Sequence, residues 1–250
     1  MGPVSLYIPR CRGHILGMNK SKHPPQFFIS LYGWTYWMPL LLAGVFAVVL
    51  FAILQIWWVV AIFAVLAFAC IAFYRDFERP IPRDGDIMVA PADGKLTEIT
   101  RIDHYAPFDG PALKLSIFLS VLDVHVNRSP CDGVVLWTRY EEGLFLDARH
   151  PDCTNKNQSN TICLGEENGG RPMAVVKQIV GAIARRIIAP VTVGETLARG
   201  QRFGMIAFGS RTELYVPAGG GSGGGGKWEP AVPLGTHVKG GSSVLLRKGV

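Results

Sequence analysis

The chain has 250 residues, enough for one sizeable domain and an additional segment. It is 49% hydrophobic and carries a net charge of +6, a balance that suits nucleic acid, an anionic membrane surface or an anionic substrate. Zinc-finger spacing and aromatic–basic RNA-binding runs are missing, so we expect a membrane and no nucleic acid as partner. The five cysteines form no C-x-x-C pair, which argues against a disulfide framework and a structural zinc and favours a reducing, cytoplasmic setting.

The first part of the chain divides into a basic segment, residues 1–26, and an apolar segment, residues 27–75. No Asp, Glu, Lys, Arg or His occurs from Pro24 to Tyr74, which leaves room for two helices of about 20 residues. We expect these helices at 36–54 and 56–74, forming a membrane-inserted hairpin with aromatic residues near its ends. A pair lying in the membrane interface is the alternative. The segment is too long for a signal peptide.

Basic residues flank the apolar segment on both sides. They predict that both ends of the hairpin, and the domain that follows it, lie on the cytoplasmic side of the inner membrane. These residues are Arg10, Arg12, Lys20 and Lys22 before the segment and Arg75, Arg79 and Arg83 after it.

Residues 76–250 predict a mostly β domain, built as an antiparallel sandwich or barrel. Short apolar runs bounded by Gly, Pro, Asn and Asp recur along it, as is typical of strands and turns. Residues 144–170 are polar, and we expect them to be mostly loop. The run 174–188 is rich in β-forming residues, although its length also fits a helix. The expected strands lie at 87–90, 95–99 and 113–119, around the turn in VHVNRSPCDGVV, and within 191–208 and 214–246.

Two glycine-containing stretches echo each other. GETLARGQRFGMI begins at Gly194 and GTHVKGGSSVLL begins at Gly235, and each runs from glycine through apolar and basic residues to a second glycine and a strand. This pattern fits paired hairpins of a small barrel, or two unrelated turns. Between them, AGGGSGGGGK at 218–227 has the composition of a flexible loop.

Three polar residues stand out, although each has an ordinary structural explanation. His125 lies in the apolar run SVLDVHVNRSP, where a lone histidine is more often a core residue than a catalyst. Asp93 lies in PADGK, a good turn sequence. Ser210 follows Gly209 between two apolar runs, and a Gly-Ser step there is commonly just a turn. The chain has no phosphate-binding loop, zinc-protease motif or nucleophile elbow.

In combination, three stretches resemble the phosphatidylserine decarboxylase family in its shorter bacterial and archaeal form. They are FYRDFERPIPRDGDIMVAPADGK, SIFLSVLDVHVNRSP and QIVGAIARRII with GQRFGMIAFGSRTELYVP. The resemblance runs from about Phe73 to Pro217, with a weaker tail to Leu246. It implies a proenzyme that cuts itself between Gly209 and Ser210 into a large chain, 1–209, and a small chain, 210–250, which remain associated.

The family chemistry implies that Ser210 becomes a pyruvoyl group, so that neither a metal nor PLP is required. This ketone would form a Schiff base with the amine of phosphatidylserine in the membrane. Loss of carbon dioxide then gives phosphatidylethanolamine, because the conjugated carbonyl system accepts the electron pair.

The resemblance also assigns roles to individual residues. Asp93, His125 and Ser210 match the family's self-cleavage set, with His125 as base and Asp93 as its orienter. After cutting, His125 could instead protonate the product or hold the substrate. Longer members have two histidines where this chain has His125 and Arg128, so the division of acid and base work stays open. Arg128 and Arg211 are candidates for binding the lipid phosphate, the alternative for Arg128 being a surface arginine in a turn.

Other readings of the sequence stay open at this point. One is a non-catalytic, membrane-anchored β-hairpin adaptor module, which predicts an intact chain that is indifferent to changes at Ser210. Another is a family member that folds but no longer cuts. A third is the same chemistry on archaetidylserine, which presents the same headgroup. Whether the protein is a homo-oligomer is also open.

Overall fold

A computed structural model describes residues 29–32, 34–83, 85–166, 170–183, 186–206, 209–219 and 227–249. The predicted basic segment 1–26, with Arg10, Arg12, Lys20 and Lys22, lies outside the described residues, and so does most of the glycine-rich stretch 218–227.

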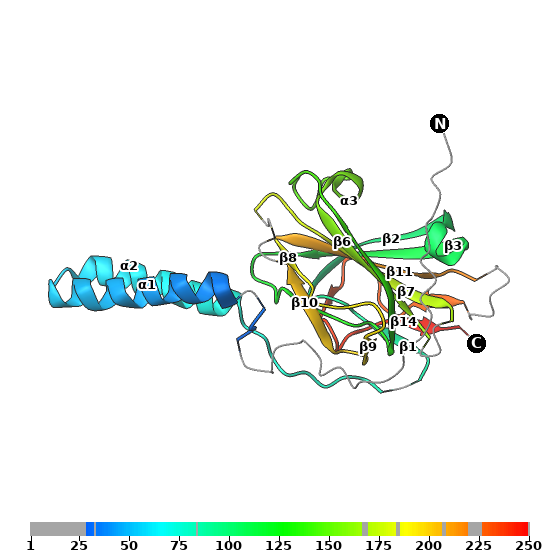
Figure 1. Cartoon of the computed structure of the whole chain (residues 1–250), viewed down its shortest axis with the longest axis horizontal. Coiled ribbons are helices and arrows are strands. Elements are labelled where there is room, and N and C mark those ends of the chain that lie inside the picture. Colours follow the sequence, from blue (N-terminus) through cyan, green and yellow to red (C-terminus); the bar gives the residue numbers. More distant parts are fainter. Residues whose placement is uncertain are drawn as a thin grey trace.

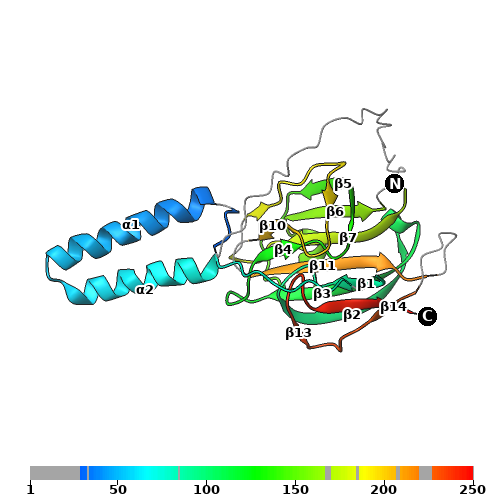
Figure 2. The same ribbon diagram turned by 90° about the horizontal axis from the view of Figure 1, so that it is seen from below.

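Two antiparallel helices project from one end of the molecule (Figures 1 and 2). Helix α1 spans Trp34–Ile53 and helix α2 spans Trp57–Phe73, close to the pair predicted at 36–54 and 56–74. The rings of Phe51 and Phe63 stack between them with centroids 5.9 Å apart. No helix in the described part of the chain combines the length and the hydropathy needed to cross a membrane. Insertion of this hairpin into a membrane stays a prediction.

The rest of the described chain is mostly β, as predicted, and its main element is a curled eight-stranded antiparallel sheet. The strand order is β13-β2-β3-β11-β7-β6-β5-β9, so β11 lies near the middle and two very short strands form the edges. The strands are β2 Gly94–Tyr105, β3 Gly110–Leu119, β5 Gly133–Glu141, β6 Ser159–Gly165, β7 Pro172–Ile179, β9 Thr196–Leu197, β11 Ser210–Pro217 and β13 His237–Val238.

Two three-stranded sheets complete the domain, in the orders β1-β14-β12 and β4-β10-β8. Their strands are β1 Ile87–Val89, β4 Val126–Arg128, β8 Ile187–Ile188, β10 Arg202–Ile206, β12 Trp228–Pro230 and β14 Val244–Lys248. Two short helices, η1 Ala106–Phe108 and α3 Cys153–Lys156, lie in connections. The run predicted at 174–188 is β structure, divided between β7 and β8.

The prediction of loop for 144–170 is wrong for its second half. Strand β6 pairs with both β5 and β7 and is buried along its whole length. The polar residues Ser159, Asn160 and Thr161, which suggested a loop, lie buried in this strand. Their polar groups are tolerated there because a sheet and its neighbours can supply hydrogen bonds.

The echoed glycine stretches have matching structures. Gly194 and Gly200 have φ of 85° and 72°, and Gly235 and Gly241 have φ of 88° and 80°, the left-handed region that glycine enters without strain. Each pair encloses a two-residue strand, β9 or β13, and these strands form opposite edges of the large sheet. The echo is therefore a repeated structural unit.

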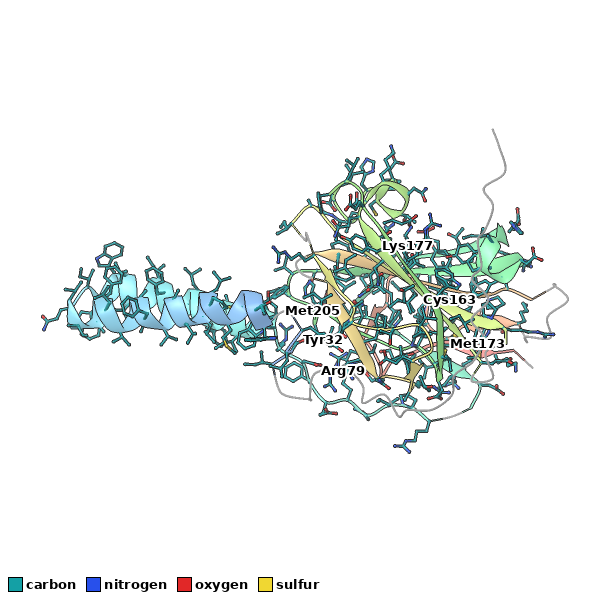
Figure 3. All side chains as sticks on the ribbon, viewed as in Figure 1. Tyr32, Arg79, Cys163, Met173, Lys177 and Met205 are labelled. Carbon is teal, nitrogen blue, oxygen red and sulfur yellow. The ribbon has the colours of Figure 1, made fainter. Side chains whose placement is uncertain are left out.

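One apolar core fills the interior of the β domain. It includes Leu96, Leu115, Ile117, Ile162, Val176, Phe203, Leu214 and Leu246, all nearly inaccessible to solvent. A second cluster joins the base of the helical hairpin to strands β4 and β10. It contains Tyr32, Trp37 and Phe73 from the hairpin side and Val126 and Met205 from the strands. Tyr32 and Met205 are labelled in Figure 3 at the end of the domain from which the helices project.

Candidate active site

Ser210 begins strand β11 at the hairpin end of the core. It pairs with Leu119 of β3, and its side chain is fully buried. Because side chains alternate along a strand, Ser210 faces the same side as Thr212 and the core residue Leu214. Within the described part of the chain, the Oγ atom of Ser210 has no hydrogen-bond partner. A buried hydroxyl without a partner costs free energy, and such an atom calls for an explanation.

Gly209 places this serine next to His125. Its φ of 60° is left-handed, which a residue with a Cβ adopts only with strain. Its N–H donates to Nε2 of His125 over 3.3 Å. The backbone of Gly181 lies so close that a Cβ added there would sit 2.1 Å from the carbonyl oxygen of Gly209. The bond between Gly209 and Ser210 is therefore held between a histidine ring and a glycine backbone.

The hydrogen bonds of His125 define its tautomer. Nδ1 lies 2.8 Å from the backbone carbonyl of Asp123, which can only accept, so Nδ1 carries the proton. Nε2 then presents a lone pair toward Gly209. The ring of Phe73, the last residue of α2, packs against the imidazole at a centroid distance of 4.4 Å. The base of the hairpin thus forms one wall of the site.

Burial controls the protonation of His125. The residue is fully inaccessible, and loss of hydration lowers its pKa from 6.5 to about 4, although the Asp123 carbonyl works in the opposite direction. At neutral pH the ring is therefore uncharged and its Nε2 can accept a proton.

Asp93 occupies a different position from the one predicted. It accepts two hydrogen bonds from the guanidinium of Arg79, one of them over 2.7 Å, and one from the N–H of Gly240 over 2.8 Å. The predicted contact with His125 is not formed, and the carbonyl of Asp123 orients the ring instead. Arg79 also donates to the carbonyl of Gly240 over 2.9 Å, so the ion pair binds both the N–H and the carbonyl of that residue. A role for Asp93 in self-cleavage stays a prediction.

The two predicted phosphate-binding arginines are both engaged inside the protein. Arg128 is buried, and its guanidinium donates to Asp76 over 2.9 Å and to the carbonyl of Gly200 over 3.1 Å. Arg211 points to the face of β11 opposite Ser210, where its Nη1 lies 3.7 Å from buried Glu213. Since these contacts occupy both side chains, their predicted binding of lipid phosphate gains no support from the geometry.

A hydrogen-bonded network of buried Asn and Gln side chains near Ser210 was not predicted from the sequence. Asn127 donates to Thr212 over 3.0 Å and accepts from Gln178 over 2.8 Å, and Asn160 donates to Gln178 over 3.0 Å. These groups belong to β4, β6, β7 and β11, so they converge only in the folded sheet. The available signal was the presence of amide side chains in short runs that also contain apolar, β-forming residues.

Four of the five cysteines lie among the described residues. Cys70, Cys131, Cys153 and Cys163 are unpaired thiols. Within the described ranges, no group of His, Cys, Asp and Glu is placed to hold a metal ion. Cys11 lies outside them.

Comparison with known proteins identifies the family. The model of the phosphatidylserine decarboxylase family matches residues 66–246, more than half of the chain. The chain is 36% identical over 227 residues to the phosphatidylserine decarboxylase proenzyme of Paraburkholderia phymatum, which covers 88% of this chain and 97% of that protein. This chain belongs to the phosphatidylserine decarboxylase family. The resemblance predicted from three motifs is thus confirmed, and with it the assignment to a family of decarboxylases.

Other relatives of this decarboxylase family agree. The proenzyme of Nitrosomonas europaea is 40% identical over 197 residues, covering 78% of this chain and 87% of that protein. That of Gluconacetobacter diazotrophicus is 42% identical over 181 residues, covering 71% and 76%. The family match includes Asp93, His125 and the Gly209–Ser210 step, whose individual roles stay predictions.

Proposed function

We propose that this chain cuts itself between Gly209 and Ser210 and then decarboxylates phosphatidylserine to phosphatidylethanolamine. The observation that carries the proposal is the buried hydroxyl of Ser210, which has no hydrogen-bond partner among the described residues and follows Gly209, whose N–H donates to Nε2 of the neutral His125 imidazole. Membership of a family whose relatives are named phosphatidylserine decarboxylase proenzymes supplies the substrate and the reaction.

The cut uses groups of the chain itself. Nε2 of His125 takes the Oγ proton of Ser210 and gives up its contact with the Gly209 N–H, and Oγ attacks the carbonyl carbon of Gly209. The peptide C–N bond breaks, the nitrogen of residue 210 takes up a proton, and an ester remains. Loss of the Cα proton of residue 210 then breaks the ester C–O bond and frees the carboxylate of Gly209. Water adds to the resulting dehydroalanine, and ammonia leaves.

The residues present fit the pyruvoyl group that this sequence would produce. Its precursor is the buried Ser210, whose Oγ has no hydrogen bond to lose among the described residues. When present, the group supplies a ketone that captures the substrate amine and accepts the electron pair left by carbon dioxide. His125 can then hold or return a proton at Nε2, while Phe73 shields this position from water. This scheme uses neither a metal nor PLP.

The large and small chains should stay together after the cut. The small chain would contain β11, which pairs with β3 on one side and β7 on the other. It would also contain β13 and β14, paired with β2 and β1. Separating the chains would break a central strand out of the sheet and expose core residues such as Leu214, which opposes dissociation.

We further propose that the helical hairpin attaches the domain to the cytoplasmic side of the inner membrane. The helices expose many large apolar side chains, a surface expected to bind other molecules or lipid. Among them are Leu42, Phe46, Trp57, Trp58, Val65 and Phe68, each at least half exposed. Since the proposed substrate is a phospholipid, a bilayer is the fitting occupant of this surface.

Intact-mass measurement of the purified protein tests the proposed cut. We expect two chains, one ending at Gly209 and one beginning with a pyruvoyl group at position 210, and decarboxylation of phosphatidylserine in vesicles. A single species of 27.3 kDa would refute the proposed self-cleavage and favour the adaptor module or a family member that no longer cuts. Ester- and ether-linked phosphatidylserine, assayed in parallel, distinguish the two lipid classes.

Vesicle flotation tests the attachment separately. Phe46→Asp combined with Phe68→Asp should reduce flotation with phosphatidylserine vesicles, because a carboxylate in the apolar region is costly. Leu234→Asp, at an exposed position of the β domain, is the matched control. Equal flotation of both variants and the unchanged protein would refute attachment through the hairpin.

A further inference from the structure

A pocket of about 510 Å³ opens beside the candidate active site. Its ionisable wall residues are the cations Arg75, Arg79 and Lys239, the carboxylates Glu78, Asp93 and Asp123, and His237. Residues 75–123 belong to the proposed large chain, whereas His237 and Lys239 belong to the proposed small chain. Arg79, one of the wall residues, is labelled in Figure 3 toward the hairpin end of the β domain. The pocket is therefore built from both chains.

Each of the three carboxylates of the pocket has a partner. Asp93 is paired with Arg79, and an oxygen of Asp123 lies 2.8 Å from Nε2 of His237. The remaining carboxylate, Glu78, lies 3.3 Å from Arg202, which stands outside the pocket wall. Two of the three carboxylates are thus neutralised by an arginine, and the third, Asp123, lies against an imidazole.

Two cations of the pocket keep their charge uncompensated. Within the described ranges, neither Arg75 nor Lys239 has a carboxylate within ion-pair distance. Arg75 donates instead to two backbone carbonyls, those of Ala72, over 2.6 Å, and Leu122. Lys239 is exposed, and its hydrogen bonds with other described residues are made by its backbone. Arg75 and Lys239 thus set two positive charges against one carboxylate, Asp123, that has no arginine or lysine partner in the described ranges, and this balance suits an anion.

The pocket lies close to His125 along the chain. Asp123 and Val124 form part of its wall and directly precede His125, and the carbonyl of Asp123 holds the imidazole. Exposed apolar side chains lie next to its wall residue Arg75 or within the wall itself. Phe77 is 40% exposed, and Leu122, whose carbonyl binds Arg75, is 82% exposed. An anion site whose wall includes the two residues before His125, with exposed apolar side chains nearby, fits a lipid headgroup better than free phosphate.

We propose that this pocket binds the phosphodiester of the phospholipid headgroup, with Lys239 and Arg75 supplying the positive charge. The inference rests on the proposed decarboxylase function and assigns the phosphate contact to residues other than Arg128 and Arg211. A lysine ammonium is a compact point charge suited to phosphate. Lys239 belongs to the proposed small chain, which would begin with the pyruvoyl group at position 210. The reacting group and the lysine that binds phosphate would therefore lie on the same chain after the cut.

The first test measures kinetics on phosphatidylserine in mixed micelles. Lys239→Gln should raise KM about tenfold and leave kcat within about threefold, since one charge near a protein surface changes anion binding by roughly this factor. Lys227→Gln is the matched control, because Lys227 is an exposed small-chain lysine paired with Glu229 away from the pocket. Equal KM values for the two variants would overturn the proposal.

A second test needs no turnover. Titration calorimetry of soluble glycerophosphoserine into the Ser210→Ala protein measures headgroup binding by the uncut chain. Adding Lys239→Gln should weaken this binding about tenfold, whereas adding Lys227→Gln should leave it unchanged. Unchanged binding in the Lys239→Gln protein would overturn the pocket assignment. An uncut, inactive wild-type chain would refute the proposed function instead, so the two failures are distinguishable.

Free phosphate is the competing source of the same chemistry. Inorganic phosphate titrated into the same proteins should bind at least about tenfold more weakly than glycerophosphoserine. Equal binding of the two probes would overturn the assignment to a lipid headgroup.

Discussion

The pH dependence of self-cleavage tests whether burial by Phe73 sets the state of His125. The pKa of the buried imidazole is about 4, against 6.5 for a hydrated one. At pH 5.5 a group with a pKa of 4 is about 97% neutral, whereas one with a pKa of 6.5 is about 9% neutral. If neutral His125 is the base, cleavage at pH 5.5 should run at nearly its neutral-pH rate and decline with a midpoint near pH 4.

Phe73→Ala should shift this profile. Removing the ring lets water reach the imidazole, and the pKa should rise by one unit or more, up to the 2.5 units that separate 4 from 6.5. The full shift corresponds to about 3 kcal/mol of differential hydration. At pH 5.5 the variant should therefore cut at as little as a tenth of its own rate at pH 7.5. Phe68→Ala, an exposed change on the same helix, should behave like wild type.

The assay follows freshly synthesised chain transferred to buffers between pH 4 and 8. Intact mass gives the uncut fraction with time, and circular dichroism establishes that the domain is folded at each pH. A wild-type midpoint near 6.5 would refute the burial argument. A Phe73→Ala profile identical to wild type would refute the assignment of that burial to Phe73.

Three further predictions concern other parts of the site. Gly181→Ala should reduce the cut fraction on gels at least about tenfold, because the added Cβ would lie 2.1 Å from the carbonyl oxygen of Gly209. Gly85→Ala is the control and should cut normally, because no atom lies within 4 Å of the added Cβ. Asp93→Asn should lower the free energy of unfolding by about 3 kcal/mol, measured with denaturant, because it breaks the buried ion pair with Arg79. Asp86→Asn, at an exposed position, should have little effect. Equal stabilities of these two variants would contradict this reasoning. His125→Gln, measured in the uncut Ser210→Ala protein, should flatten the pH dependence of the free energy of unfolding. The pKa of His125 is about 4 in the folded state and 6.5 in the unfolded state, so the protein that retains His125 loses stability progressively as the pH falls from 6.5 to 4. An unchanged slope in that window would contradict the burial of a neutral histidine.

Local patterns predicted the parts of this protein whose physics is local. The uncharged run before Arg75 predicted the helical hairpin, since nearly every one of its side chains is apolar. The recurrence of short β-forming runs and turns predicted a mostly β domain. The Gly209–Ser210 step between two strands, together with His125, pointed to the reacting residues through a family resemblance. These features depend on residues that are close together in the sequence, so they can be predicted without the tertiary structure.

Contacts between distant residues were beyond such reasoning. Asp93 was predicted to orient His125, yet it binds Arg79 and the backbone of Gly240. The sequence spacing cannot distinguish these partners, because they are 14 and 147 residues from Asp93 and come together only when the sheets form. Buried strand β6 was missed for the same reason, because the groups that satisfy its polar side chains lie on other strands.

The sequence by itself determined the helical hairpin and the β class and, through a family resemblance, named the Gly209–Ser210 step and His125 as candidates. Only the tertiary structure decided the protonation of His125, because its pKa depends on how completely Phe73 and the core exclude water. It also decided which cations pair with carboxylates: Arg128 and Arg211 do, whereas Arg75 and Lys239 of the pocket wall have no carboxylate within ion-pair distance among the described residues. Charge and hydration act through space, and the fold sets those distances.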